Sequence, residues 1–330
     1  MNIFFKSKLK DIWLEYYMRV ALITGASGQD GYYLQEFLRN KGYHIKCIPR
    51  GGNIEAFITD IMWYDRIEVY NLAAQSHVGQ SNIDAKHTFE VNTGSILKIL
   101  ETIKKFGIRY KCRVFQASSS EMFGSVDESP QDEKTPFNPT TMYGVSKLAA
   151  HWIVKNFRDV HGLFVCSGIL FNHESHRRDD RFVTQKIVKG LKAGECINLG
   201  NLEARRDWGH AEDYVEAMWL MLQQKQPSDY VVATGKSHSV REFINIAVEK
   251  LGKHITWESD NNVGKVDGKI FIRVSPELFR SQDTNLLLGN PTKLESLGWK
   301  RKYDIHGLIE EMLYPQELTV QASNTLESNG

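Results

Sequence analysis

A glycine-rich turn between a strand and a helix is the sequence feature that most constrains the fold of this chain. An apolar run over residues 20–24 leads into the turn, and a helical pattern follows over residues 32–40. The turn has the spacing GxxGxxG and consists of Gly25, Ala26, Ser27, Gly28, Gln29, Asp30 and Gly31. Such glycines allow a tight turn and let the backbone approach a pyrophosphate at the helix N-terminus. The turn predicts a dinucleotide site, with a glycine-rich turn that binds no ligand as the alternative.

The rest of the first half alternates between strand-like and helix-like segments. Apolar strand patterns occur at 44–48, 67–72, 113–117 and 163–170, and helical patterns at 54–64, 93–106 and 143–159. Strands that alternate with helices predict a parallel sheet. We therefore expect an α/β fold of the doubly wound Rossmann type, with ligands at the carboxyl ends of its strands.

The second half has a looser pattern. Helices are expected at 182–191, 211–224, 239–251 and 308–313, and strands at 196–199 and 230–234. We expect a smaller α/β lobe packed on the sheet, with a ligand cleft between them. The expected division is an N-terminal extension (1–17), a dinucleotide-binding domain (18–171 plus about 205–238), a substrate-binding lobe (172–204 and 239–315) and a flexible tail (316–330).

Composition argues against several classes of function. Hydrophobic residues make up 42% of the chain and charged residues 25%, as in ordinary soluble domains. A net charge of +1 gives no electrostatic reason to expect nucleic acid or a membrane as a partner. The four cysteines are widely spaced, which indicates reduced, mostly core residues of a cytoplasmic protein, with no disulfide framework and no metal site. They are Cys47, Cys112, Cys166 and Cys196.

Tyr143 and Lys147 are the first candidates for catalytic residues. Four residues apart in a predicted helix, they share a face. We expect the ammonium of Lys147 to lower the pKa of Tyr143 towards neutrality, which would make the phenol a base for a substrate hydroxyl. Ser119 and Glu121 follow a predicted strand and, in extended backbone, would point the same way. Glu121 adds an acid that simple alcohol oxidation does not need; a solvated turn residue or helix cap is the alternative.

The residues after the second strand bear on the choice of dinucleotide. An acid there holds the ribose 2′-hydroxyl of NAD, whereas an Arg accommodates the 2′-phosphate of NADP. The chain has Ile48-Pro49-Arg50-Gly51-Gly52 at this place, without an acid. We therefore expect NADP, with a solvated surface Arg50 as the alternative.

Several stretches together carry a family resemblance. The glycine motif, Tyr143-x-x-x-Lys147 and Ser119 at a strand end resemble the extended branch of the short-chain dehydrogenase/reductase superfamily. Within it, the chain from about Met18 to Glu311 resembles the GDP-mannose 4,6-dehydratase family. The stretches that narrow the match are Val-Ala-Leu-Ile-Thr-Gly with Gly-Gln-Asp-Gly in 20–31, Val-Tyr-Asn-Leu-Ala with Gln-Ser-His-Val in 69–78, Gln-Ala-Ser-Ser-Ser-Glu-Met-Phe-Gly at 116–124, Gly-Ile-Leu-Phe-Asn-His-Glu-Ser at 168–175, Arg-Arg-Asp-Trp-Gly-His-Ala-Glu-Asp-Tyr-Val at 205–215 and Leu-Leu-Gly-Asn-Pro-Thr-Lys at 287–293.

The resemblance implies an NADP-dependent hydro-lyase that converts GDP-mannose to GDP-4-keto-6-deoxymannose, towards GDP-fucose or another deoxysugar. Tyr143 would deprotonate the sugar 4-hydroxyl as a hydride leaves carbon 4 for NADP. Lys147 and Ser119 would order Tyr143, and Ser119 stands where the family has Thr. Glu121 would take the proton of carbon 5 and protonate the departing 6-hydroxyl. The hydride would then return to carbon 6.

The resemblance also implies the binding residues. Contacts to NADP would come from the whole turn 25–31 and from Arg50, Leu72, Ala73, Ala74, Gln75, Ser76, His87, Tyr143, Lys147, His173 and Arg178. Contacts to the GDP-sugar would come from Ser76, Ser119, Glu121, Asn172, Val183, Lys186, Gly200, Arg206, Arg280 and Asp283. Asp283 stands where the family has Glu and His87 where it has Tyr. His210, within the matched stretches, is expected to be a packed structural histidine.

The chain departs from the family between Arg50 and Ile67, where members have a basic loop and a third strand. Because the third strand lies at a sheet edge, its loss would leave the second strand as the edge and give a poorer adenosine pocket. The family's basic loop joins dimers into tetramers, so we expect a homodimer built from the helices at 93–106 and 143–159.

Two other functions compete with this interpretation. Another extended-family enzyme, such as a nucleotide-sugar 4-epimerase or reductase, would share Tyr143 and Lys147 but lack an equivalent of Glu121. A catalytically weak nucleotide-binding scaffold would account for the shortened 50–67 segment but not for the intact set of Ser119, Glu121, Tyr143 and Lys147.

Overall fold

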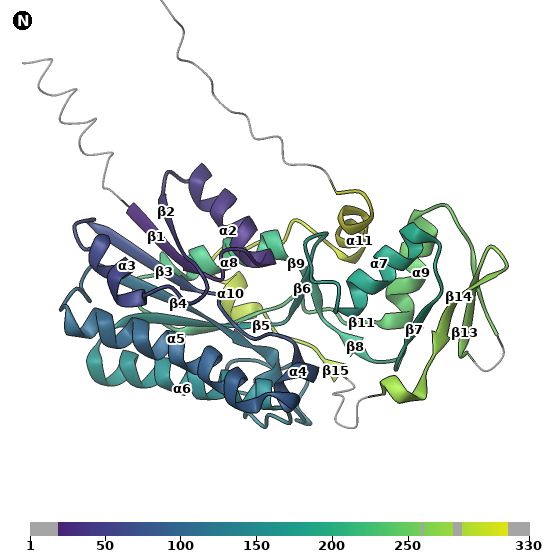
Figure 1. Ribbon diagram of the computed structural model, residues 1–330, viewed down its shortest axis with the longest axis horizontal. Coiled ribbons are helices and arrows are strands. Elements are labelled where there is room, and N and C mark those ends of the chain that lie inside the picture. Colours follow the sequence, from purple (N-terminus) through teal and green to yellow (C-terminus); the bar gives the residue numbers. More distant parts are fainter. Residues whose placement is uncertain (1–18, 259–260, 280–285, 316–330) are drawn as a thin grey trace, which may run out of the picture.

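The computed structural model of the chain describes residues 19–258, 261–279 and 286–315. The expected extension 1–17, the expected tail 316–330 and the candidate residues Arg280 and Asp283 lie outside these residues. Figure 1 shows a large sheet with helices on both faces and, beside it, a second group of helices and smaller sheets.

The larger part is a six-stranded parallel sheet in the order β10-β5-β4-β3-β1-β2. Its strands are β1 (Arg19–Thr24), β2 (His44–Ile48), β3 (Arg66–Asn71), β4 (Cys112–Ser119), β5 (Phe164–Leu170) and β10 (Asp229–Val232). The helices around it are α2 (Gln29–Asn40), α3 (Ile54–Asp60), α4 (Val78–Ile83), α5 (Ala85–Lys105), α6 (Met142–His161), α8 (Ala211–Leu222) and the short α10 (Thr292–Glu295). This arrangement confirms the doubly wound α/β fold.

Both faces of the sheet are covered at its centre, which is why residues 20–23 of β1 are apolar throughout. In β1, Ala21 and Ile23 belong to a core shared with α2 and α8. The alternate residues Val20 and Leu22 belong to a second core on the other face, shared with α3, α5 and α6. Side chains alternate between the two faces of a strand, so a strand covered on both sides must be apolar throughout.

Strand β2 forms one edge of the sheet. Strand β1 pairs directly with β2 on one side and with β3 on the other, so that Val20 stands opposite both His44 and Ile67. Between β2 and β3 the chain forms only the short helix α3, in a stretch that is described throughout. The expected absence of a third strand is thereby confirmed.

The second group of elements has a core of its own. Helices α7 (Val183–Ala193), α9 (Val240–Lys250) and α11 (Ile305–Leu313) pack there with β7 (Ile197–Leu199), β12 (Ile255–Trp257), β13 (Val263–Val266) and β14 (Lys269–Val274). Strand β6 (Asn172–Glu174) pairs with β9 (Trp208–His210), and β8 (Arg205–Arg206) lies between β11 (His238–Ser239) and β15 (Leu286–Leu287). None of β6, β8, β9 and β11 to β15 was predicted.

Several element boundaries differ from the sequence expectations. Helix α5 begins at Ala85 rather than 93, because the side chain of Asp84 caps it by accepting from the backbone N–H of His87. Cys112 and Cys166 are buried, but Cys47 and Cys196 are exposed, so the expectation of mostly core cysteines is wrong for two of the four. No helix in the described ranges is long and apolar enough to cross a bilayer.

Candidate active site

A close backbone contact brings the candidate catalytic residues together. Strand β4 ends at Ser119, and the chain then forms a 3₁₀ turn, η1 (Ser120–Met122). The first turn of α6 rests on this turn: a Cβ added to Gly144 would lie 2.5 Å from the carbonyl oxygen of Glu121. Glycine is therefore required beside Tyr143. The contact places the start of α6 at the carboxyl end of β4, which is the ligand-binding edge of a doubly wound sheet.

Glu121 reaches this edge from the turn rather than from a strand. The expectation that it continues in extended backbone beyond Ser119 is wrong, because η1 begins at Ser120. The hydroxyl of Ser119 caps the turn by accepting from the backbone N–H of Glu121 at 3.2 Å. The Ser119 hydroxyl also acts to lower the pKa of Tyr143, against the rise that burial causes. One hydroxyl thus acts on both candidate acid/base residues.

Burial keeps the Tyr143 phenol protonated. It raises the pKa of Tyr143 to about 12; the Ser119 hydroxyl opposes this rise, and the charge of Glu121 adds to it. The expectation that Lys147 brings this pKa towards neutrality is therefore not met. The ammonium lies 5.7 Å from the centre of the Tyr143 ring and donates at 2.8 Å to the carbonyl of Ala117.

Lys147 is itself strongly affected by its surroundings. It is 3% exposed, and burial lowers the pKa of Lys147 to about 8, although the charge of Asp30 opposes this shift. A lysine whose pKa lies near neutral pH can bind or release a proton after only a small change in pH or in nearby charge. Tyr143 and Lys147 are thus one turn apart on α6, with their pKa values moved in opposite directions.

The glycine turn fits the pyrophosphate of a dinucleotide. Gly25 has a φ of +69°, and a Cβ there would lie 2.8 Å from the backbone nitrogen of Ala73. A Cβ on Gly31 would lie 2.5 Å from the carbonyl oxygen of Gly25. Gly28 is the N-cap of α2, and no side chain caps this helix end. The N–H groups of the first turn are therefore available to an anion, which the helix dipole also favours.

Asp30, which is partly buried, and His173, which is buried, form an ion pair that joins the glycine turn to β6. One ring nitrogen, Nδ1, lies 2.8 Å from the carbonyl of Phe171 and must donate, because a carbonyl only accepts. The other, Nε2, lies 2.9 Å from the Asp30 carboxylate. Burial alone would lower the pKa of His173, but the Asp30 charge and hydrogen bond outweigh it and raise that pKa. The Asp30 carboxylate therefore favours the protonated form of the ring.

A buried asparagine that sequence reasoning missed orders two parts of the site. Asn92 on α5 accepts from the backbone N–H of Gln75 at 2.9 Å and donates to the hydroxyl of Ser146 at 2.8 Å. It therefore ties the stretch after β3 to the helix that carries Tyr143. The helical spacing of the sequence indicates that Asn92 is buried, because it lies on the same face of α5 as the buried residues Ile96 and Ile99.

The remaining candidates for cofactor contacts lie after β3, after β2, on α5 and after β6. Leu72, Ala73, Ala74 and Ser76 follow β3 next to the glycine turn, and Thr24 accepts from the first two of their N–H groups at 3.1 Å. Arg50 is exposed in the turn after β2. His87 is exposed in the first turn of α5. Arg178 lies 3.0 Å from Glu174 and stacks on Phe182.

The described candidates for sugar-nucleotide contacts belong mainly to the second group of elements. Asn172 begins β6, Val183 begins α7, and Lys186 is exposed on α7. Gly200 follows β7, where a Cβ would lie 2.7 Å from the carbonyl oxygen of Leu278. Arg206 ends β8 and donates to the carbonyl of Arg205.

Known proteins resemble this chain over most of its length. The family described as GDP-mannose 4,6 dehydratase matches residues 52–312. A GDP-mannose 4,6 dehydratase from Homo sapiens is 44% identical over 336 residues, covering 89% of this chain and 90% of that protein. A GDP-mannose 4,6-dehydratase from Vibrio cholerae is 38% identical and covers 94% of this chain and 97% of its own length.

Solved structures with the same fold are more distant in sequence. The NAD complex of a UDP-glucose 4-epimerase from Thermus thermophilus has a TM-score of 0.75 at 24% identity, covering 91% of this chain and all of that one. A dTDP-glucose 4,6-dehydratase from Streptomyces venezuelae has a TM-score of 0.76 at 20% identity, covering 90% and 96%. These likenesses concern the fold. The matched family region and the full-length relatives decide the assignment, and the chain belongs to the GDP-mannose 4,6-dehydratase family.

Proposed function

We propose that this chain is a GDP-mannose 4,6-dehydratase, which converts GDP-mannose to GDP-4-keto-6-deoxymannose and water. The observation that carries the proposal is the position of Glu121 beside Tyr143 at the end of β4, held by the backbone contact at Gly144. Oxidation of a sugar hydroxyl needs one base; loss of water needs a second acid/base group, and Glu121 supplies it.

We infer that the dinucleotide is NADP. The absence of an acid after β2 and the presence of Arg50 there support this choice over NAD. NADP, when bound, supplies the hydride acceptor for carbon 4 and the hydride donor for carbon 6. The turn 25–31 would hold its pyrophosphate, and the sheet domain 18–171 plus about 205–238 would carry it. The lobe 172–204 and 239–315 would hold the GDP-sugar.

The side chains then have separate roles. Tyr143 accepts the proton of the sugar 4-hydroxyl, with Ser119 aligning the two hydroxyls and the Lys147 ammonium stabilising the phenolate that forms. Glu121 removes the proton of carbon 5, which the 4-ketone acidifies, and protonates the departing 6-hydroxyl. Each of these proton transfers contributes about 10²–10⁴-fold to the rate.

The reaction and the two acid/base assignments can be tested together. Purified protein incubated with NADP and GDP-mannose should yield a product lighter by one water in mass spectrometry. Glu121→Gln should lose that product yet still reduce bound NADP slowly, because the 4-hydroxyl chemistry does not use Glu121. Tyr143→Phe should lose both signals by at least about 10²-fold.

Two results would contradict these assignments. A Glu121→Gln enzyme that eliminates water at the normal rate removes Glu121 from the reaction, and NADP reduction by Tyr143→Phe removes Tyr143 as the base. A wild-type product of unchanged mass but altered stereochemistry would instead identify an epimerase.

Lys147 should lower the stability of the chain while serving catalysis. Its pKa of about 8, against an ordinary value of 10.5, means that the unfolded chain binds its proton more tightly than the folded chain does. Stability therefore rises with pH between these two values, and the buried charge costs about 3 kcal/mol below pH 8. Lys147→Met should raise the free energy of unfolding at pH 7 by about 1–3 kcal/mol and abolish activity.

Urea unfolding at pH 7 and at pH 9.5 measures this effect. The increase in the free energy of unfolding caused by Lys147→Met should be smaller at pH 9.5, because folded wild-type protein has then already released the Lys147 proton. If Lys147→Met stabilises the protein equally at both pH values, or destabilises it at pH 7, the assignment of a destabilising buried ammonium is contradicted.

We further propose that the chain forms a homodimer through α5 and α6. These helices pack side by side on one face of the sheet (Figure 1). Their exposed apolar side chains include Phe89 and Leu97 on α5 and Val145 and Trp152 on α6. Residues seven or eight apart lie on one face of a helix. A second copy that packs the same two helices against these would bury this surface in a closed twofold interface.

The proposed interface predicts that Trp152→Glu converts a dimer to a monomer, because it places a charge in the apolar contact. Trp63→Glu serves as the matched control: Trp63 is 60% exposed and Trp152 52% exposed, and Trp63 stacks on Tyr64, whose hydroxyl bonds to His44 of β2. Light scattering on both variants gives the mass. A wild-type tetramer, or dissociation caused by Trp63→Glu instead, would refute the interface.

A further inference from the structure

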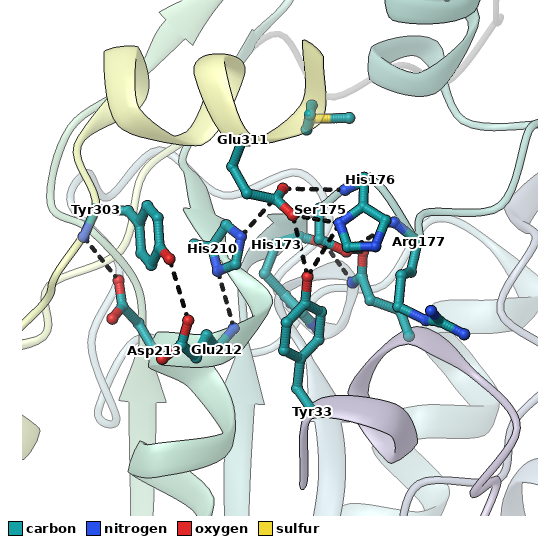
Figure 2. Close-up of polar contacts among 12 residues, drawn as sticks. Tyr33, His173, Ser175, His176, Arg177, His210, Glu212, Asp213, Tyr303 and Glu311 are labelled. Atoms are coloured by element: carbon teal, nitrogen blue, oxygen red, sulfur yellow. Dashed lines mark hydrogen bonds and ion pairs between the residues drawn. The ribbon is translucent and has the colours of Figure 1, made fainter. Parts of the chain in front are cut away.

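A carboxylate on the last helix of the described chain gathers side chains from three distant segments. Glu311 on α11 is contacted by Tyr33 of α2, by His176 after β6 and by His210 at the end of β9, and we refer to these four residues as the Glu311 cluster. Figure 2 shows the three side chains converging on the Glu311 carboxylate from below and from both sides. None of the four was assigned to substrate or cofactor above.

The contacts of the cluster are specific. Tyr33 donates its hydroxyl to Glu311 at 3.3 Å, and His176 contributes both its backbone N–H, at 3.1 Å, and its ring Nδ1. His210 accepts at Nδ1 from the backbone N–H of Glu212, so its ring proton is on Nε2, which lies 3.3 Å from Glu311. Burial opposes the charge, but the two adjacent histidines lower the pKa of Glu311 to about 2.

The cluster joins the core between the sheet and α2 to the core of the second group of elements. Tyr33 is 5% exposed and belongs to the core between the sheet and α2. The neighbours of Glu311 on α11, including Leu308 and Met312, belong to the core of the second group of elements. The partly buried Glu311 carboxylate, bonded to Tyr33 and His176 and 3.3 Å from the His210 ring, holds these two bodies at one separation, because removing a donor leaves its charge less well satisfied.

Helix α2 is therefore held at two successive points. At its N-terminus, Gln29 donates to the carbonyl of His173 at 3.0 Å, and Asp30 pairs with the His173 ring. One turn later, Tyr33 binds Glu311. The N–H groups that would face a pyrophosphate belong to this same first turn, and a binding group must be held within about 0.5 Å of its working position.

We propose that the Glu311 cluster is a positioning device that fixes α2 against the second lobe and thereby sets the affinity of the glycine turn for the dinucleotide, without touching it. This inference rests on the function proposed above. It means that cofactor affinity is coupled to the placement of the last described helix, and that loosening α11 weakens NADP binding before it affects any catalytic side chain.

Two tyrosine variants separate positioning from general support. Tyr33→Phe removes a hydroxyl that binds Glu311 at 3.3 Å, and Tyr303→Phe removes one that binds Glu212 at 3.1 Å. The ring of Tyr303 stacks on His210 at 3.9 Å, so both tyrosines adjoin the same cluster, but only Tyr33 lies on α2. Glu311→Gln removes the central charge.

The experiment measures NADPH affinity by titration calorimetry, GDP affinity by the same method, and thermal stability. Tyr33→Phe and Glu311→Gln should each weaken NADPH binding by about fivefold or more, as for a typical coupling between sites. Tyr303→Phe should leave NADPH affinity within about twofold of the wild-type value, and the double variant Tyr33→Phe/Glu311→Gln should be little weaker than Glu311→Gln alone. GDP affinity should not change in any variant.

Different results overturn different statements. The positioning role is wrong, and the proposed function stands, if Tyr33→Phe binds NADPH as tightly as the wild type does. The same conclusion follows if Tyr33→Phe and Tyr303→Phe both weaken NADPH binding in proportion to the loss in their melting temperatures. If the wild type binds neither NADPH nor NADH, the proposed function fails and takes the positioning role with it.

Discussion

The contact between the backbone of α6 and the carbonyl of Glu121 is the constraint on which the site depends. Because Gly144 lacks a Cβ, the first turn of α6 can lie directly on η1. Tyr143 and Lys147 are then positioned by one helix axis, Ser119 by the end of β4 and Glu121 by the turn η1 that follows it. The acid/base groups are thus aligned by rigid backbone elements rather than by flexible loops, as precise chemistry requires.

The same arrangement places ionisable groups where water is scarce. Lys147 is satisfied by the carbonyl of Ala117 and not by a carboxylate, whereas His173 is paired with Asp30. A buried paired charge is supported by its partner, but a buried ammonium held by a carbonyl remains poorly stabilised. The site therefore combines a stable ion pair at the glycine turn with a destabilised lysine at the place of reaction.

Much of this organisation could be predicted from the sequence, for physical reasons. Strands buried on both faces give continuous apolar runs, and Gly25 and Gly31 of the turn are required by contacts shorter than a Cβ allows. Turn geometry after β4 could not be foreseen, because three serines before Glu121 are compatible with either strand or turn. The pKa of Tyr143 was predicted in the wrong direction, since a sequence shows a neighbouring lysine but not the depth of burial.

Contacts between distant segments lay beyond sequence reasoning altogether. His176 and Glu311 are 135 positions apart, and no periodicity connects them. The short strands β12 to β14 were missed for a related reason. They depend on pairing with one another and with β7, and on Trp257 packing over Gly264, rather than on a strong apolar pattern of their own.

The position of β2 at the edge of the sheet has a consequence for how this chain could change. An open edge can recruit strands from other molecules, but β2 is only five residues long and has His44 and Lys46 exposed, with Pro49 just beyond its end. Short, charged edges discourage such pairing. The exposed turn at Arg50 and Gly51 is therefore a point where extra residues, even a whole added strand, could be accommodated without disturbing the buried strands beside it.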